Sequence, residues 1–155
     1  AISGAHYNPA VTISSLLTGG VKVMEAVAYI VTQIIGAIIG VLIANAMFSD
    51  ALIGSSSIVR SGSGQFIGEV VATAGLVYLA LTATEKSAWK MIPLWIFAAY
   101  FFTASTSFAN PAVTISRIFT DAPTGISGES VLGFISAQIV GALLTVLALK
   151  SKVMK

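Results

Sequence analysis

Residues 8–14 of the chain read NPAVTIS, and the same seven letters return as residues 110–116. The similarity continues beyond the motif, because QIIGA at residues 33–37 corresponds to QIVGA at residues 138–142. An internal repeat of this kind marks a repeated structural unit. We interpret the unit as a short motif, a linker and a long apolar helix. The chain is then a single domain, 1–155, with one copy in residues 1–48 and the other in residues 65–150.

The composition indicates an integral membrane protein. Of the 155 residues, 56% are hydrophobic and only 9% are charged, whereas roughly a quarter are charged in an average soluble protein. The net charge is +2, and the basic residues form no cluster in the sequence, which argues against binding to nucleic acid. With no cysteine, one histidine and six carboxylates, we expect no disulfide, no metal site, no cofactor and no enzymatic activity.

Each motif is predicted to begin a helix that is too short to cross a bilayer. Asn8 suits the N-cap, Pro9 suits the first helical position, and the glycines at 19 and 20 suit the helix end. Residues 8–18 would form a helix of ~16 Å, about half of a ~30 Å hydrocarbon core. The second motif is predicted to begin a similar half-helix over residues 110–119.

Four apolar segments are predicted to span the membrane: residues 26–48, 65–84, 91–105 and 131–149. The first contains Gly36 and Gly40 in a GxxxG pattern, which would let another helix approach closely unless the glycines are scattered by composition. Residues 49–64 are rich in serine and glycine and are predicted to form an aqueous loop. The second span carries Glu69, and a carboxylate inside a span is expensive enough to suggest a function or a structural network. The predicted fold class is an all-α membrane protein.

The order of the segments predicts an inverted repeat. Two spans precede the second motif, but only seven residues precede the first, so we expect a parent protein with two further N-terminal helices. Most basic residues fall on one side of this arrangement, which the positive-inside rule makes the cytoplasmic side together with the C-terminus. These residues are Lys22, Lys86, Lys90, Lys150, Lys152 and Lys155. We therefore expect a multi-pass protein of the plasma membrane, with Arg60 and Arg117 toward the outside.

The two motifs have a physical consequence if their half-helices meet at the middle of the bilayer. A helix N-terminus carries about half a positive elementary charge and free N–H donors. Two such ends facing each other would repel cations, including a hydrated proton, but not a neutral molecule with lone pairs. The amides of Asn8 and Asn110 could donate hydrogen bonds to that molecule. The simpler alternative is that Asn-Pro only begins two helices.

These residues resemble the aquaporin (major intrinsic protein) family. The resemblance rests on SGAHYNPAVT at residues 3–12, on the second motif, and on three polar residues inside the spans, Gln33, Glu69 and Gln138. It implies a passive channel in the lipid bilayer, usually a homotetramer with one pore per subunit. The pore motifs it implies are Asn8, Pro9, Ala10, Asn110, Pro111 and Ala112.

The resemblance also implies roles for single side chains. Glu69 would brace the backbone of the second motif's loop, with Gln33 and Gln138 as structural support, although the carboxyl could instead be idle, protonated or paired with the loop. His6 would line the pore on the cytoplasmic side. It could also be a histidine that only packs.

The sequence departs from the family directly after the second motif. Most members have arginine there, as part of a narrow selectivity filter, whereas this chain has Val113. By the family's spacing the other filter positions are Ala98, where water-selective members have histidine, and Ser107, and a fourth would lie on an absent helix. All three residues are small, so the resemblance implies a wider and less charged constriction. Thr114 also differs from the aspartate of glycerol-conducting members.

Arg117 follows Val113 by four residues, which on a helix places both on one face about 6 Å apart along the axis. We expect Arg117 to guard the outer vestibule in place of the missing filter arginine, or else to form an i,i+4 pair with Asp121.

The function that these observations favour is a passive pore for water and small neutral solutes, namely glycerol-like polyols and neutral metalloid acids such as arsenous acid. An ion-coupled secondary transporter also uses inverted repeats and broken helices, but only Glu69 lies well inside a span to couple ions. A non-conducting scaffold is a third possibility. An enzyme fits least, because no nucleophile, base and orienting group converge.

Overall fold

The computed structural model describes residues 3–153, with side chains described to residue 151, and the regular structure in this part of the chain is helical. The α-helices are α1 (Pro9–Leu17), α2 (Val23–Met47), α3 (Ser63–Thr82), α4 (Glu85–Phe102), α5 (Pro111–Ser116) and α6 (Gly128–Val153). A 3₁₀ turn, η1 (Arg117–Phe119), continues α5.

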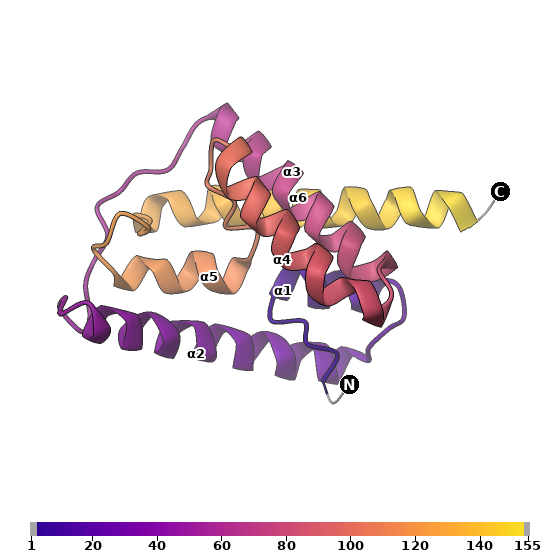
Figure 1. Ribbon diagram of the computed structural model, residues 1–155, viewed down its shortest axis with the longest axis horizontal. Helices are drawn as coiled ribbons and strands as arrows, with labels where there is room; N and C mark the ends of the chain where they lie inside the picture. Colours follow the sequence, from indigo (N-terminus) through magenta and orange to yellow (C-terminus); the bar gives the residue numbers. More distant parts are fainter. Residues whose placement is uncertain (1–2, 154–155) are drawn as a thin grey trace.

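The two short helices lie at the centre of the bundle. Figure 1 shows α1 and α5 end to end, with α2 along one side, α6 along the other and α3 and α4 crossing them. Helix α1 contacts α2, α3 and α6, and α5 contacts α2 and α6. Most residues of α1 and α5 are buried, whereas only Ala26 and Asn45 are buried in the 25 residues of α2. The half-helices predicted from the Asn-Pro motifs are therefore enclosed by the long helices.

Three of the long helices are long and apolar enough to cross a membrane. They are α2, α3 and the part of α6 up to Ser151, with mean hydropathies of 2.4, 1.5 and 2.2. Large apolar side chains along α2, such as Val31, Ile35 and Ile39, are about half exposed. Side chains of this kind are suited to lipid rather than to water.

The boundaries of the third predicted span differ from the prediction. Helix α4 begins at Glu85 and ends at Phe102, so the charged residues that we expected before the span form its first turns. A carboxylate in the first turn of a helix is stabilised by the helix dipole, which favours this early start. The uncharged part, from Met91 to Phe102, is correspondingly short.

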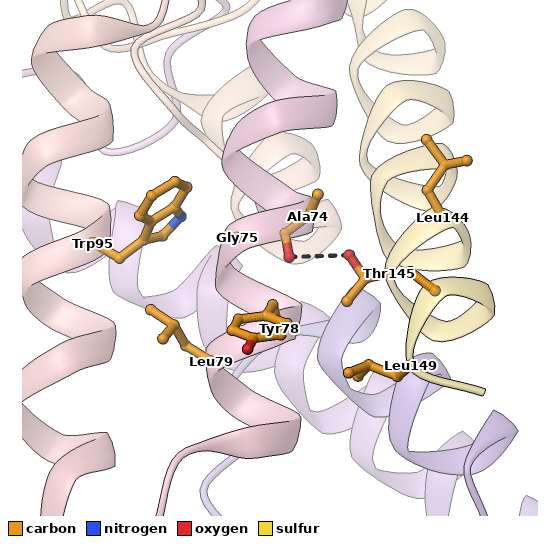
Figure 2. Close-up of a pocket in the computed structure, with 9 residues that line it drawn as sticks. Ala74, Gly75, Tyr78, Leu79, Trp95, Leu144, Thr145 and Leu149 are labelled. Carbon is orange, nitrogen blue, oxygen red and sulfur yellow. Dashed lines mark hydrogen bonds between the residues drawn. The ribbon is translucent and has the colours of Figure 1, made fainter. Parts of the chain in front are cut away.

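Helices α3 and α6 pack closely at a glycine. A Cβ on Gly141 would overlap the carbonyl oxygen of Val70, and Thr145 Oγ1 donates a 3.0 Å hydrogen bond to the carbonyl of Ala74 (Figure 2). The glycines of the GxxxG pattern behave differently. A Cβ at Gly36 or Gly40 would meet nothing within 4 Å, so within the described part of the chain no helix makes the close approach that this pattern predicted.

Helix α4 is held against α3 by a tryptophan. The ring of Trp95 occupies the space where a side chain at Gly75 would lie, and its Nε1 donates to the carbonyl of Ala72 at 2.9 Å. Tyr78 and Leu79 of α3 and Leu144 and Leu149 of α6 complete an apolar groove of about 490 Å³ (Figure 2). The groove consists of packing surface and is separate from the two motifs.

The segments that connect the helices form two groups, one at each end of the bundle. The start of α2, the turn between α3 and α4 and the end of α6 lie at one end of the bundle, at the right in Figure 1. The connections 48–62 and 119–127 lie at the other end. This arrangement places the predicted lysine-bearing segments together, although Lys155 and the side chain of Lys152 lie outside what is described.

Candidate functional site

The two motifs cap their own helices and bind each other. Asn8 Oδ1 accepts a hydrogen bond from Ala10 N at 2.9 Å, and Asn110 Oδ1 accepts one from Ala112 N at 3.0 Å. In addition, Asn8 Nδ2 donates to the carbonyl of Ala109 at 2.7 Å, and Asn110 Nδ2 donates to the carbonyl of Tyr7 at 2.9 Å. Each asparagine thus binds the residue that precedes the other asparagine, and the two helix N-termini are tied together.

The backbone before each motif has the same unusual conformation. Tyr7 and Ala109 both have φ of 49°, and Ala5 and Ser107 both have φ of 51°. The left-handed region is costly for residues other than glycine. These residues stand at matching positions before Asn8 and Asn110, so the sequence repeat is also a repeat of backbone conformation.

The arrangement produces a region of positive potential between the motifs. The N-termini of α1 and α5 face each other there, and each contributes free N–H donors and the positive end of its dipole. An amide nitrogen carries two hydrogens, so each asparagine keeps a second donor beyond its bond across the repeat. A neutral molecule with an oxygen acceptor fits this chemistry, whereas a cation is repelled.

Glu69 holds the segment in front of the second motif. Its side chain is fully buried. Oε1 accepts from Ser105 Oγ at 2.6 Å and from Phe108 N at 2.8 Å, and Oε2 accepts from Ala109 N at 2.8 Å and from Gln138 Nε2 at 2.6 Å. Four donors therefore converge on one carboxyl group. Two of them are backbone N–H groups directly before Asn110, so the strained conformation there is held from α3.

The two glutamines occupy matching places in the repeats. Gln138 Nε2 donates to Thr114 Oγ1 at 2.8 Å, and Gln33 Nε2 donates to Thr12 Oγ1 at 3.0 Å. Each glutamine thus joins a long helix to the half-helix of its own repeat. Both Oε1 atoms are buried without a hydrogen-bond partner.

His6 lies beside the first half-helix and is partly buried. Its Nδ1 is 3.1 Å from Thr12 Oγ1, and its ring meets the ring of Tyr29 edge-on with 5.5 Å between centroids. The side chain therefore has packing partners on α1 and α2.

The three predicted filter residues have different surroundings. Val113 lines a cavity of about 960 Å³ between α2 and the second half-helix, opposite Ala37 and Gly40. Ser107 is 3% exposed, and its Oγ is buried without a hydrogen-bond partner. Ala98 is partly buried on α4. Of the three, it is Val113 that lines this cavity.

Arg117 lines the same cavity as Val113. Its guanidinium carbon lies 4.2 Å from the centroid of the Phe108 ring, and its Nη1 is buried without a hydrogen-bond partner. The predicted helical i,i+4 relationship with Asp121 is wrong. Helix α5 ends at Ser116, and Thr120 is already extended, with φ of −137° and ψ of 139°. Asp121 is exposed at the rim of the cavity.

The segment between α2 and α3 is a loop, as predicted, but it is hydrogen-bonded through its backbone to the connection between α5 and α6. Gly54 N donates to Phe119 O at 3.1 Å, Ser56 N donates to Ile118 O at 3.0 Å, and Ser127 N donates to Ile58 O at 2.7 Å.

Arg60 belongs to this loop and was missed as a candidate. Its Nε donates to Gly125 O at 2.8 Å, its Nη2 donates to Pro123 O at 2.9 Å, and its guanidinium carbon lies 5.0 Å from the Phe108 ring centroid. The one signal in the sequence was the apolar pair Ile58-Val59 before an arginine in a segment of serine and glycine.

Comparisons with known proteins find one family. The family model described as "Major intrinsic protein" matches residues 1–109. The chain is 42% identical over 146 residues to aquaglyceroporin AqpS of Rhizobium meliloti (strain 1021), which covers 92% of the chain and 62% of that protein.

Two eukaryotic relatives match a shorter part. Aquaporin-1 of Rattus norvegicus is 39% identical over 90 residues, covering 55% of the chain and 34% of the relative. The probable aquaporin PIP2-6 of Oryza sativa subsp. japonica is 42% identical over 90 residues, covering 54% and 32%. The chain spans less than two thirds of the length of each of these relatives.

Proposed function

Because the chain belongs to the major intrinsic protein family, we propose that it forms a passive transmembrane channel for water and small neutral solutes. The observation that carries the proposal is the pair of reciprocal hydrogen bonds from Asn8 to Ala109 and from Asn110 to Tyr7. They hold two helix N-termini against each other inside a bundle that is apolar on the outside.

Ion exclusion follows from this geometry. The two N-termini concentrate positive potential where the solute would pass. A cation loses hydration energy there and gains no compensating ligand. A neutral hydroxyl compound accepts hydrogen bonds from the two asparagines, so it crosses without that penalty.

The proposed solutes include molecules larger than water. A valine at position 113, small residues at 98 and 107 and the cavity beside Val113 favour glycerol-like polyols and neutral metalloid acids in addition to water. The relative AqpS is named as an aquaglyceroporin, which agrees with this choice. Ala98, Ser107 and Val113 are the proposed filter residues.

The remaining site residues are proposed to support the pore. Glu69 would brace the segment before Asn110 through its four hydrogen bonds. Gln138 and Gln33 would hold the half-helices through Thr114 and Thr12. His6 is proposed to border the pore near Thr12.

The chain is a membrane protein, and we propose its membrane, its oligomeric state and its orientation. We propose the plasma membrane and a homotetramer on the basis of the family alone. We propose a cytoplasmic C-terminus because the lysine-bearing segments share one end of the bundle (Figure 1). The outer end then carries Arg60, Arg117 and the cavity beside Val113.

The test is stopped-flow swelling of vesicles that contain the protein at its full natural length, with water, glycerol and arsenous acid in turn. We expect flux of all three that is independent of ion gradients, compared with vesicles without protein. Flux that requires a proton or sodium gradient would instead support the ion-coupled transporter, and no flux of any of the three would reject the channel.

A further inference from the structure

Two arginines from different parts of the chain meet at one aromatic ring. The guanidinium carbon of Arg117 lies 4.2 Å and that of Arg60 lies 5.0 Å from the centroid of the Phe108 ring. Phe108 is 5% exposed and stacks edge-on with Phe134, with 5.1 Å between centroids. The ring is therefore fixed, and both cations are attracted to its electrons.

Bringing two positive charges together is unfavourable, so the fold has to hold them there. Burial, and after it the charge of Arg117, lower the pKa of Arg60, yet an arginine remains charged in a protein. Arg60 is anchored by its bonds to Gly125 O and Pro123 O and by its backbone N, which donates to Ser130 Oγ at 2.9 Å. The anchors come from both sides of the turn that leads into α6.

Arg117 has a side-chain N–H group without a hydrogen-bond partner. Its Nη1 is buried without a hydrogen-bond partner, while the residue lines the cavity together with Val113. Leaving a buried guanidinium donor unpaired is costly. Nη1 itself is closed off from the cavity, so Arg117 acts on a molecule there through its charge, which a partly buried site transmits over a longer distance than an exposed one.

We propose that Arg60 is a specificity-determining residue, which together with Arg117 forms a two-arginine collar on Phe108 that repels cations at the outer mouth, in place of the charge that is absent at Val113. This inference rests on the proposed channel function. Phe108 stands two residues before Asn110, so the potential of the collar adds to that of the half-helix N-termini.

The exposed carboxylates beside the cavity do not cancel the collar, although the charge of the buried Glu69 raises the pKa of Arg60 and so offsets part of it. Asp50 and Asp121 line the same cavity but are exposed, and water and salt screen exposed charges strongly. The two arginines are partly buried, where a charge acts over a longer distance. Among the residues that line the cavity, Arg117 is the partly buried charge and the two aspartates are the exposed ones.

The test compares substitutions that separate charge from anchoring, in vesicles that contain the protein at its full natural length. Arg60→Gln removes the charge and keeps a hydrogen-bond donor, Arg60→Lys keeps the charge, and Arg117→Gln removes the other charge. Lys90→Gln is the matched control, because Lys90 Nζ also lies over a ring, 4.9 Å from the centroid of Trp89, but in the N-terminal part of α4. Sodium permeability and glycerol flux are measured on each preparation.

We expect Arg60→Gln and Arg117→Gln to raise sodium permeability by about tenfold, as the removal of one partly buried charge predicts, with glycerol flux retained. Arg60→Lys and Lys90→Gln should exclude sodium as the unchanged protein does. Equal sodium exclusion by all variants would overturn the inference, as would equal leaks in Arg60→Lys and Arg60→Gln, which would make Arg60 only a loop anchor.

Two further outcomes keep this inference apart from the proposed function. If Arg60→Gln does not fold and carries no glycerol, Arg117→Gln decides whether charge at the collar matters, because its Nη1 holds no other group. Absence of glycerol and water flux in the unchanged protein would overturn the channel proposal and the collar with it. Normal flux without a sodium leak in the charge-removing variants would overturn the collar alone.

Discussion

The side-chain amide of Asn8 donates a 2.7 Å hydrogen bond to the carbonyl oxygen of Ala109, across 101 positions of the sequence. The second repeat returns the bond from Asn110 to Tyr7. Both accepting residues have left-handed backbones, with φ of 49°. The centre of the molecule is therefore a contact between two matching motifs, each of which donates a hydrogen bond to the other.

Two substitutions of Asn8 separate its two roles, which are to cap α1 and to donate a hydrogen bond to Ala109. Asn8→Ser keeps an oxygen that can cap α1 but loses the donor to Ala109, so a buried carbonyl is left unpaired at a cost of about 1–3 kcal/mol. Asn8→Ala loses the cap as well, and should be less stable by about a further 1 kcal/mol. Thermal unfolding in detergent measures the order, with Thr32→Ala on the exposed face of α2 as control. An Asn8→Ser protein as stable as the unchanged one would contradict the prediction.

Replacing Glu69 by glutamine should strongly destabilise the protein. Each carboxyl oxygen accepts two hydrogen bonds, so an amide nitrogen in either position faces two donors without an acceptor. We expect Glu69→Gln to lower the free energy of unfolding by about 3 kcal/mol or more. Glu129→Gln, at an exposed site at the start of α6, should change it little. The role of Glu69 would need revision if the two variants unfolded at the same temperature.

The two repeats provide a matched pair of glycine substitutions. Gly141→Ala places a methyl group against the carbonyl of Val70, and we expect it to destabilise the protein by about 1–3 kcal/mol. Gly36→Ala, at the matching position of the first repeat, meets open space and should be neutral or stabilising by up to about 1 kcal/mol, because alanine favours a helix. Unfolding temperatures of the 155-residue chain check both, and a larger loss at Gly36 would be the contrary result.

Placing an arginine at position 113, where most members of the family have one, should favour water over glycerol. Val113→Arg adds a long charged side chain to the wall of the cavity, so glycerol should be hindered more than water, with a glycerol-to-water flux ratio lower by about tenfold. Val113→Leu adds volume without charge and controls for size. Stopped-flow swelling gives both fluxes, and an unchanged ratio in Val113→Arg would place the constriction elsewhere.

Much of this fold could be predicted because its signals are local. An N-cap followed by proline defines the start of each half-helix, and long uncharged segments define the spans. Glu69 could be singled out because a carboxylate in an apolar helix needs partners. Only the family resemblance pointed to its partners, because three of the four lie in the segment 105–109, which only the folded chain brings to α3.

Other features depend on tertiary structure from the start. The relationship of Arg117 to Asp121 was predicted from helical spacing, but α5 ends at Ser116, and the 3₁₀ turn η1 that follows ends before the extended Thr120. The contact of Arg60 with Phe108 could not be predicted, because it depends on the pairing of its loop with the connection between α5 and α6. Local sequence signals thus define the fold of the two repeats, whereas the end of the bundle that carries Arg60 and Arg117 is assembled from distant segments.

The backbone pairing of residues 54–58 with residues 118, 119 and 127 makes this end of the bundle tolerant of one kind of sequence change and intolerant of another. Substitutions there leave the main-chain bonds in place, so side chains facing outward are free to vary. An insertion or deletion of a single residue before Arg60 would shift the register and turn its side chain to the opposite face. We therefore expect related chains that keep this arginine to keep the length of the loop before it, even where its letters differ.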